Sequence, residues 1–344
     1  MNIKKNKSLL EFNTFGVEST VAHYLKIATE EDLYDSIKYV EKNRLKYFFL
    51  GGGSNILLTS EKYNMAALHI QTSGIEIIDE DDESITIRCA AGENWDDVVA
   101  FSVERGLGGI ENMSLIPGTI GAAPIQNIGA YGQELKDTFV EARVLLTDTK
   151  KTVDISNEEC NFGYRDSIFK KELKDKAVIL YVTLKLRKNP KLNYSYKGVR
   201  EIIFVRGDEQ VTVKEIRNAI IQLRTEKLPD PAILGNAGSF FKNPEVPQEV
   251  FLGLKERYPT IPGYHTGSGE VKIPAGWLIE SNGWKGYREG NVGVHDRQAL
   301  VIVNHGGATG DEVRGLASRI IESVEEKYGI RLHPEVNYIF GSVS

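Results

Sequence analysis

The first 71 residues combine short apolar runs with one amphipathic stretch, which predicts strands around a single helix. The runs with strand character are 21–28, 47–50 and 66–70. A helix is predicted over 29–43, because Thr29 can cap it, acidic residues fill its first turn, and Leu33, Ile37 and Val40 share one face. We expect this first β-rich unit to end near residue 71.

Residues 72–190 have the pattern of a second β-rich unit. Two apolar runs around an acidic turn predict a hairpin over 75–92, and a similar pattern predicts another over 140–156. The stretch 93–106 is helical in its spacing, and 176–188 reads as one long strand. Between them lies a stretch, from residue 106 to 133, that is rich in glycine, alanine, proline and asparagine.

The chain from 205 to 325 is more helical. The stretch 212–227 predicts an amphipathic helix with a capping box formed by Thr212 and Glu215. Further elements are expected as helices at 247–259, 275–284 and 311–329 and as strands at 298–305 and 332–340. The whole pattern predicts an α+β fold with mixed sheets and three domains: 1–71 together with a returning strand at 331–344, then 72–190, then 205–325.

Composition narrows the class of protein. The net charge is −6, from 42 Lys and Arg against 48 Asp and Glu, which argues against nucleic acid or an anionic membrane as the main partner. Cys89 and Cys160 have no partner at metal-ligand or disulfide-framework spacing, so we expect two reduced thiols and no metal site. No signal peptide or membrane span is apparent, and we expect a soluble, cytoplasmic monomer.

The stretch "FLGGGSNILLT" places three glycines after an apolar run. Gly51, Gly52, Gly53, Ser54 and Asn55 can present consecutive main-chain N–H groups to a pyrophosphate. A tight turn between two strands explains the same glycines equally well. Neither the lysine of a P-loop nor a helix after the glycines is present, so a dinucleotide bound here implies a fold other than the Rossmann fold.

A second glycine-rich segment runs from Gly106 to Leu135. A flexible linker would explain its seven glycines, but the isoleucines at positions 110, 116, 120, 125 and 128 are too apolar for a linker. We therefore favour a packed loop that lines a large ligand.

Eight motifs now occur in a fixed order along essentially the whole chain: "NTFGVEST", "FLGGGSNILLT", "SLIPGTIGAAPIQNIGAYGQEL", "FGYRDSIFK", "GNAGSFFKNP", "PAGWLIESNGWKG", "VHDRQALVIVN" and "HPEVNYI". Together they resemble the UDP-N-acetylenolpyruvoylglucosamine reductase family. The resemblance implies an FAD-binding fold of the vanillyl-alcohol-oxidase type in the first two domains and a substrate-binding domain in the third. It also implies NADPH as the reductant and the enolpyruvyl ether of UDP-N-acetylglucosamine as the substrate.

The resemblance implies that both glycine-rich segments bind FAD. Besides residues 51–55, the cofactor-binding positions would be Pro117, Gly118, Gly121, Ala122, Gln126, Asn127, Gly129 and Ala130. No histidine lies within either segment, and we expect none beside residues 51–55, so FAD is expected to be noncovalent.

Three residues would carry the chemistry in such an enzyme. By resemblance Arg165 binds the substrate carboxylate, Glu335 stabilises the enolate and Ser239 donates the proton. Glutamate helps an anion only when protonated, so we expect burial to raise the pKa of Glu335. Without the resemblance, these side chains read as a surface arginine, an edge-strand glutamate in water and a serine in a turn or cap.

The resemblance also implies residues that bind the substrate: Tyr164, Tyr196, Lys227, Asn243, Tyr264, Lys272, Lys285 and Gln298. Tyr196 resembles the tyrosine of a mobile loop that covers the substrate in one structural subclass, although neighbouring Tyr194 fits the same role in another register. Two other functions stay open on the sequence alone. One is an oxidase of the same fold, and the other is a nucleotide-binding protein without catalytic activity.

Overall fold

The computed structural model describes residues 2–206, 211–267 and 269–341. These residues divide into two compact units. The first contains the chain up to residue 7 with 22–52 and 64–226, and the second contains 8–21, 53–63 and the chain from 227 on. This division cuts the chain elsewhere than the three expected domains, which stay a prediction.

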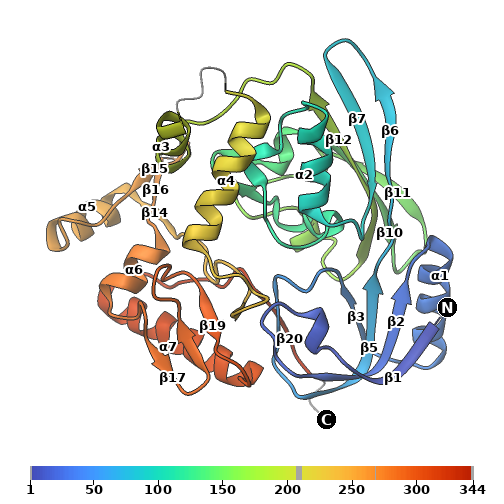
Figure 1. Cartoon of the computed structure of the whole chain (residues 1–344). Coiled ribbons are helices and arrows are strands. Elements are labelled where there is room, and N and C mark those ends of the chain that lie inside the picture. Colours follow the sequence, from blue (N-terminus) through green and yellow to red (C-terminus); the bar gives the residue numbers. More distant parts are fainter. Residues whose placement is uncertain (1, 207–210, 268, 342–344) are drawn as a thin grey trace. The chain divides into compact units, whose positions relative to one another are not determined.

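Two sheets build most of the first unit (Figure 1). The four-stranded sheet has the order β1-β2-β5-β3, with strands Asn2–Ser8, Thr20–Ile27, Lys62–Ile70 and Tyr47–Leu50. The antiparallel five-stranded sheet has the order β11-β10-β12-β7-β6, with strands Thr152–Ser156, Phe139–Leu146, Ala177–Arg187, Ser84–Ala90 and Ile75–Glu80. The predicted hairpins and the long strand are therefore confirmed.

Capping side chains begin the first two helices. In α1 (Glu30–Lys42) the Thr29 side chain accepts a hydrogen bond from the Asp32 main-chain N–H, as the sequence predicted. In α2 (Trp95–Glu104) the Asn94 side chain accepts hydrogen bonds from the main-chain N–H groups of Asp96 and Asp97. Both helices bury their apolar face in one core with the two sheets, and Figure 1 shows α2 beside the five-stranded sheet.

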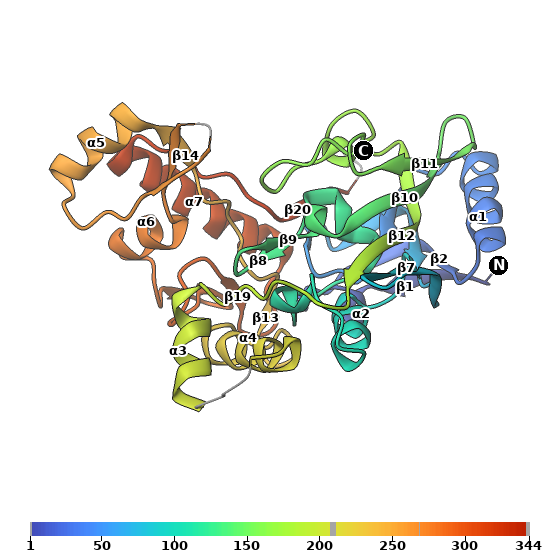
Figure 2. The same ribbon diagram turned by 90° about the horizontal axis from the view of Figure 1, so that it is seen from above.

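The helices α3 (Lys197–Arg206) and α4 (Val213–Lys227) share a small core of their own, built around Val199, Ile216 and Ile220. Figures 1 and 2 both show the two helices next to each other. The sequence predicted α4, and the Thr212 side chain accepts from the Lys214 main-chain N–H at 3.2 Å. It did not predict α3, whose sequence "KGVREIIFVR" follows a polar stretch with no clear cap.

The second unit has three small sheets. One has the order β13-β19-β18-β17, with strands Gly235–Asn236, Ile302–Asn304, Val292–Val294 and Arg288–Glu289. Another has the order β14-β16-β15, with strands Glu245–Pro247, Glu270–Lys272 and Tyr264–His265. The third pairs β20 (Asn337–Ile339) in parallel with β4 (Ile56–Leu58).

Three helices complete the second unit: α5 (Gln248–Arg257), α6 (Ala275–Ser281) and α7 (Gly310–Tyr328). All three were predicted. The helix α7 has a full capping box between Thr309 and Glu312 and ends at Gly329, which adopts the left-handed conformation. The side chains of α7 that face the core pack with those of α6 in a second hydrophobic core.

Candidate functional site

The three glycines at 51–53 pack closely against other parts of the chain. A Cβ on Gly51 would come within 2.9 Å of Thr119 Oγ1, and one on Gly52 within 3.0 Å of the Gly118 Cα. Gly53 has a φ of 63°, and a Cβ there would overlap the carbonyl oxygen of Phe12. Main-chain packing therefore excludes a side chain at Gly53 and leaves little room for one at Gly52, whereas at Gly51 the nearest atom belongs to the Thr119 side chain.

The contact between Gly52 and Gly118 joins the two glycine-rich segments. They are more than 60 residues apart in sequence, and their main chains lie against each other without intervening side chains. Gly52 and Pro117 are exposed at this junction. A pyrophosphate requires close approach to main chain, so the junction fits the phosphate part of a dinucleotide.

His69 lies directly beside Gly51, and the expectation that no histidine does so is wrong. Leu50 pairs with His69 in the parallel register of β3 and β5, and the His69 ring hydrogen-bonds the Gly51 main chain. The Tyr24 hydroxyl lies 2.7 Å from His69 Nδ1. If Nδ1 accepts from Tyr24, the other ring nitrogen is left to donate to the Gly51 carbonyl oxygen. Parallel pairing of two strands that are not consecutive in the chain gives no local signal, so the sequence did not show this contact.

We expect His69 to make stability fall in mild acid. Burial lowers the pKa of His69 to about 4, from an ordinary value near 6.5. The unfolded chain therefore binds the proton first, and the native state loses up to about 3 kcal/mol as the pH falls from roughly 6.5 to 4. Urea unfolding at pH 7.5 and pH 5 should show about 2 kcal/mol of this loss, and His69→Gln should remove most of it. An equal loss in the variant would assign the effect to other groups.

The second glycine-rich segment is ordered and packed, so the linker interpretation is wrong. Ile110, Met113 and Ile120 are fully buried in the core of the first unit. The Trp95 indole N–H donates to the Met113 carbonyl oxygen at 2.9 Å. A Cβ on Gly121 would come within 2.6 Å of the Ala91 Cβ, so this glycine too is required by packing. Ile125 stays exposed, at 38 %.

Arg165 lies in a tight turn that the glycine-rich segment holds. Gly163 and Asp166 bond each other's main chain across the turn, at 3.0 and 3.3 Å. The buried Asn127 side chain donates to the Gly163 carbonyl oxygen at 3.1 Å. On the far side of the turn, Ser167 Oγ donates to the Ile125 carbonyl oxygen at 2.7 Å. The turn and the segment that is expected to lie along the flavin are therefore fixed to each other.

The backbone of Arg165 has a φ of 54°, which a non-glycine residue adopts only when its surroundings enforce it. Its guanidinium donates to the Gly129 carbonyl oxygen at 2.8 Å and lies 5.8 Å from the Tyr164 ring. Half-buried and never uncharged, this fork is suited to bind a planar carboxylate. The Asn127 side chain, by contrast, bonds other parts of the main chain, at Gly163 and Lys136.

Ser239 and Glu335 lie on two neighbouring extended segments of the second unit. The Glu335 N–H donates to the Phe240 carbonyl oxygen at 2.8 Å, and Phe241 bridges Pro334. Ser239 is exposed and Glu335 is half-buried. The sequence separates these residues by almost a hundred positions, and the chain brings them together.

Asn55 belongs to the same place. Its side-chain amide donates to the Glu335 carbonyl oxygen at 3.2 Å, and its own carbonyl oxygen accepts from the Asn337 N–H at 3.0 Å. The end of the first glycine-rich segment is therefore bonded to the segment that contains Glu335 and the start of β20. In the second unit a residue expected to bind FAD thus lies beside a residue expected to act on the substrate.

Several expected substrate ligands meet on the β14-β16-β15 sheet. Lys272 pairs across the sheet with both Tyr264 and Glu245, and its ammonium group bonds Glu245 at 3.0 Å. Asn243, just before β14, accepts from the Ala275 N–H at the start of α6. The exposed Tyr264 is the member of this group with most of its surface open.

The other expected ligands are spread over both units. Lys285 pairs with Glu280 at 2.9 Å, Gln298 accepts from the Leu300 N–H, and Lys227 is exposed at the end of α4. Tyr164 and Tyr196 belong to the first unit. Which of these side chains contact substrate stays a prediction.

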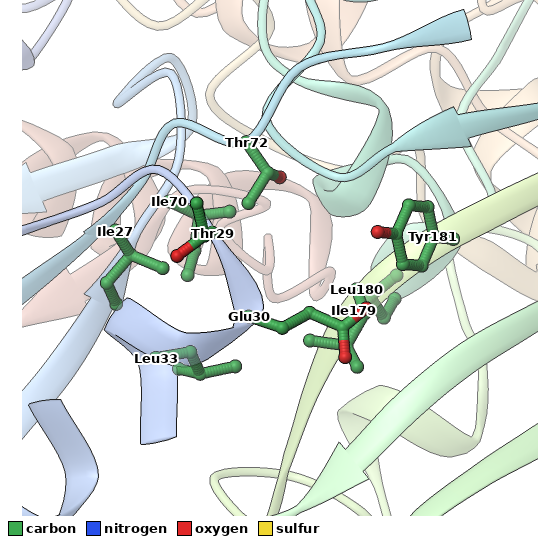
Figure 3. A pocket seen from close by; sticks show the side chains of 9 residues that line it. All are labelled: Ile27, Thr29, Glu30, Leu33, Ile70, Thr72, Ile179, Leu180 and Tyr181. Atoms are coloured by element: carbon green, nitrogen blue, oxygen red, sulfur yellow. The ribbon is translucent and has the colours of Figure 1, made fainter. Parts of the chain in front are cut away.

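Two hollows in the first unit differ greatly in size. The one in Figure 3 lies among Ile27, Leu33, Ile70 and Tyr181 and has a volume of about 10 Å³, enough for one water molecule. The other has a volume of about 590 Å³ and is lined by residues 191–195 with Arg200 and Phe204. The small hollow is therefore no ligand site, whereas the large one adjoins Tyr196.

Within the described ranges, no group of three or more His, Cys, Asp and Glu side chains could hold a metal ion. Cys89 and Cys160 are buried free thiols, as expected, and burial raises the pKa of each to about 12. No helix in the part of the chain that the structure describes is long and apolar enough to cross a membrane.

Comparison with known proteins gives two family matches. Residues 21–155 match the FAD binding domain, and residues 230–339 match the C-terminal domain of UDP-N-acetylenolpyruvoylglucosamine reductase. A reductase of that name from Flavobacterium johnsoniae is 45% identical over 340 residues, covering 98% of this chain and 100% of its own. One from Pseudomonas aeruginosa is 44% identical over 337 residues, covering 98% and 99%.

The fold agrees with these matches. A crystal structure of UDP-N-acetylenolpyruvylglucosamine reductase from Thermus caldophilus superposes with a TM-score of 0.66 over 98% of both chains, at 24% identity. The expected α+β fold, with an FAD-binding part and a further C-terminal domain, is confirmed. The fold and the matched domains define the class: this is an FAD-dependent oxidoreductase. The chain belongs to the UDP-N-acetylenolpyruvoylglucosamine reductase family.

Proposed function

We propose that this chain reduces the enolpyruvyl group of UDP-N-acetylglucosamine enolpyruvate to give UDP-N-acetylmuramate, a precursor of peptidoglycan, with NADPH as the reductant. The relatives named for this reductase activity match over essentially their full length. One observation in the second unit carries the proposal. The main chain of Glu335 is hydrogen-bonded both to the Asn55 side chain and to Phe240, the residue that follows Ser239.

When bound, FAD would supply the hydride, taken from NADPH, that adds to the terminal carbon of the enolpyruvyl double bond. The pyrophosphate of this cofactor is proposed to bind at the exposed junction of Gly52 with Gly118, where its oxygens can approach main-chain N–H groups closely. The hydrogen bond between His69 and the Gly51 main chain helps to fix the conformation of the first segment. These residues bind and orient the cofactor.

Arg165 binds the substrate carboxylate. Hydride addition to the terminal carbon pushes the electron pair of the double bond into the carboxylate, which becomes an enolate. A guanidinium stabilises that charge without losing its proton, and its strained backbone and the bond to Gly129 hold it in one place before the reaction.

Ser239 gives its hydroxyl proton to the carbon next to the carboxylate, and the electron pair of the enolate forms the new C–H bond. A serine hydroxyl is a weak acid, so it does this only when held close to a strongly basic carbon. Glu335 supports the enolate as a carboxylic acid that donates a hydrogen bond. The serine alkoxide regains its proton from water between turnovers.

The diphosphate requires cations and hydrogen-bond donors. Lys227, Lys272 and Lys285 are the lysines proposed to bind it. Two of them are paired with glutamates in the structure, so binding substrate competes with those pairs. Tyr196 is proposed to cover the bound substrate.

An anaerobic absorption experiment tests the proposed function. We expect a flavin band that bleaches when NADPH is added and returns when UDP-N-acetylglucosamine enolpyruvate is added. A band that returns only with air would make the protein an oxidase of the same fold. A band that NADPH does not bleach would contradict the proposed reductant.

A further inference from the structure

Tyr131, in the second glycine-rich segment, is held from two sides although its backbone is strained. Its φ is 49°, in the left-handed region. The fully buried Asn112 side chain donates to the Tyr131 carbonyl oxygen at 2.8 Å. The Arg224 guanidinium, on α4, donates to the Tyr131 hydroxyl oxygen. The surrounding structure therefore fixes both ends of this residue.

A charged cluster between α2 and α4 supports the hydroxyl end. Arg217 binds both carboxylate oxygens of Asp96, at 2.7 and 2.8 Å. The same carboxylate accepts a hydrogen bond from the Leu115 N–H at 2.6 Å, and it attracts the Arg224 guanidinium electrostatically. Leu115, with a φ of 57°, is another strained residue of the glycine-rich segment. The Asp96 carboxylate thus supports the segment at two strained residues, directly at Leu115 and through Arg224 at Tyr131.

The same segment is bonded to the chain that leads to Tyr196. Asn112 Nδ2 also donates to the Asn193 carbonyl oxygen at 2.7 Å, and the Asn193 amide donates to the Gly132 carbonyl oxygen at 3.1 Å. Beyond these bonds, the Tyr131 and Tyr196 rings meet edge to face with centroids 5.0 Å apart. Tyr196 is otherwise 47 % exposed, so Tyr131 gives its ring a fixed support.

We propose that Tyr131 is a positioning residue that holds Tyr196 ready to cover the substrate, and so joins the segment along the cofactor to the segment over the substrate. The inference rests on the proposed function, in which Tyr196 covers the substrate. Tyr131 itself need not touch the substrate. Its ring limits the directions in which Tyr196 can point, which lowers the entropy lost when the substrate is covered.

The variant Tyr131→Leu tests this role. Leucine, like tyrosine, is not branched at Cβ, so the free-energy cost of the left-handed backbone at position 131 stays about the same. The aromatic ring and the hydroxyl are lost. We expect the KM for UDP-N-acetylglucosamine enolpyruvate to rise about tenfold, with bleaching of the flavin by NADPH changed less than twofold. Tyr131→Phe, which keeps the ring, should restore most of the affinity. Tyr34→Leu, on α1, makes the same side-chain change outside this network and should leave both values unchanged.

A double-mutant cycle separates positioning from general damage to the fold. If Tyr131 acts through Tyr196, then Tyr131→Leu should raise KM far less in a Tyr196→Leu background than in the wild type. Equal rises in both backgrounds would overturn the proposal, and so would an unchanged KM in Tyr131→Leu. Loss of bound FAD in Tyr131→Leu would also overturn it, because the residue would then serve the cofactor site.

Hydrogen exchange provides a readout that does not depend on activity. We expect the main-chain amides of residues 191–200 to exchange several-fold faster in Tyr131→Leu than in the wild type or in Tyr34→Leu. If the wild type fails to reduce the proposed substrate but this difference is present, the proposed function is wrong and the mechanical coupling stands. If the wild type is active and the exchange is unchanged, the coupling is wrong.

Discussion

Replacing Ser239 with alanine should leave the first half of the reaction intact and stop the second. We expect Ser239→Ala to bind FAD and to be bleached by NADPH at the wild-type rate, because the exposed hydroxyl has no part in hydride uptake. Return of the flavin band on adding UDP-N-acetylglucosamine enolpyruvate should slow by roughly 100- to 10,000-fold, which is the usual contribution of a positioned proton donor. Stopped-flow absorbance measures both halves on one sample.

The control for this variant is Ser318→Ala. Ser318 is exposed on α7 in the same unit, so removing its hydroxyl should change neither half-reaction. Full turnover in Ser239→Ala would remove the residue from the mechanism. Slowing of both halves together would instead indicate that the turn around Gly238 and Ser239 had lost its shape, which the circular dichroism spectrum would also report.

Much of the fold could be predicted because local signals agree with the tertiary structure. Thr29 caps α1 as its spacing indicates, and the apolar face of Leu33, Ile37 and Val40 is the buried one. Where the sequence lacked a local signal, the prediction failed. The segment from Lys197 begins a helix after a polar stretch, and its apolar residues are buried in a small core shared with α4.

The candidate site could be predicted only as separate motifs. The sequence marked Ser239 and Glu335 through their resemblance to a family, but nothing local indicates that the Glu335 N–H bonds to the Phe240 carbonyl oxygen. His69 was missed for the same reason, since parallel strand pairing joins distant residues. Arg165 could be assigned its role, whereas its left-handed backbone conformation follows from contacts with Asn127 and Gly129 that only the folded chain makes.

The glycines at 51–53 show best how one pattern can have two causes. From the residues alone, a pyrophosphate and a tight turn explain them equally well, and the family resemblance favours the pyrophosphate. In the structure, a side chain at position 53 would overlap the Phe12 carbonyl oxygen, whether or not a cofactor is bound. The two causes predict different results for one substitution, because one acts only on the cofactor complex and the other acts on the folded protein itself.

Gly53→Ala should therefore destabilise the protein even after FAD has been removed. Alanine at a φ of 63° costs about 1–2 kcal/mol, and moving the overlapping Phe12 carbonyl costs about 1–3 kcal/mol more, so we expect the free energy of unfolding to fall by about 3 kcal/mol. Urea unfolding of the FAD-free protein measures this change. Gly315→Ala, on exposed surface of α7 with open space around its Cα, should instead stabilise the protein by about 0.5–1 kcal/mol.

The comparison with FAD-bound protein then separates the two causes. If the loss in Gly53→Ala is equally large with and without FAD, chain packing is the reason for this glycine, and the cofactor uses a cradle that the fold already requires. If the FAD-free variant is as stable as the wild type and only its affinity for FAD falls, the pyrophosphate is the reason, and Phe12 yields to the new methyl group. A Cβ on Gly52 would come no closer than 3.0 Å to its nearest neighbour, Gly118, and the Gly52 backbone is not left-handed, so Gly52→Ala should fall between Gly53→Ala and Gly315→Ala. A graded series of this kind would measure how much of the glycine pattern belongs to folding and how much to the cofactor.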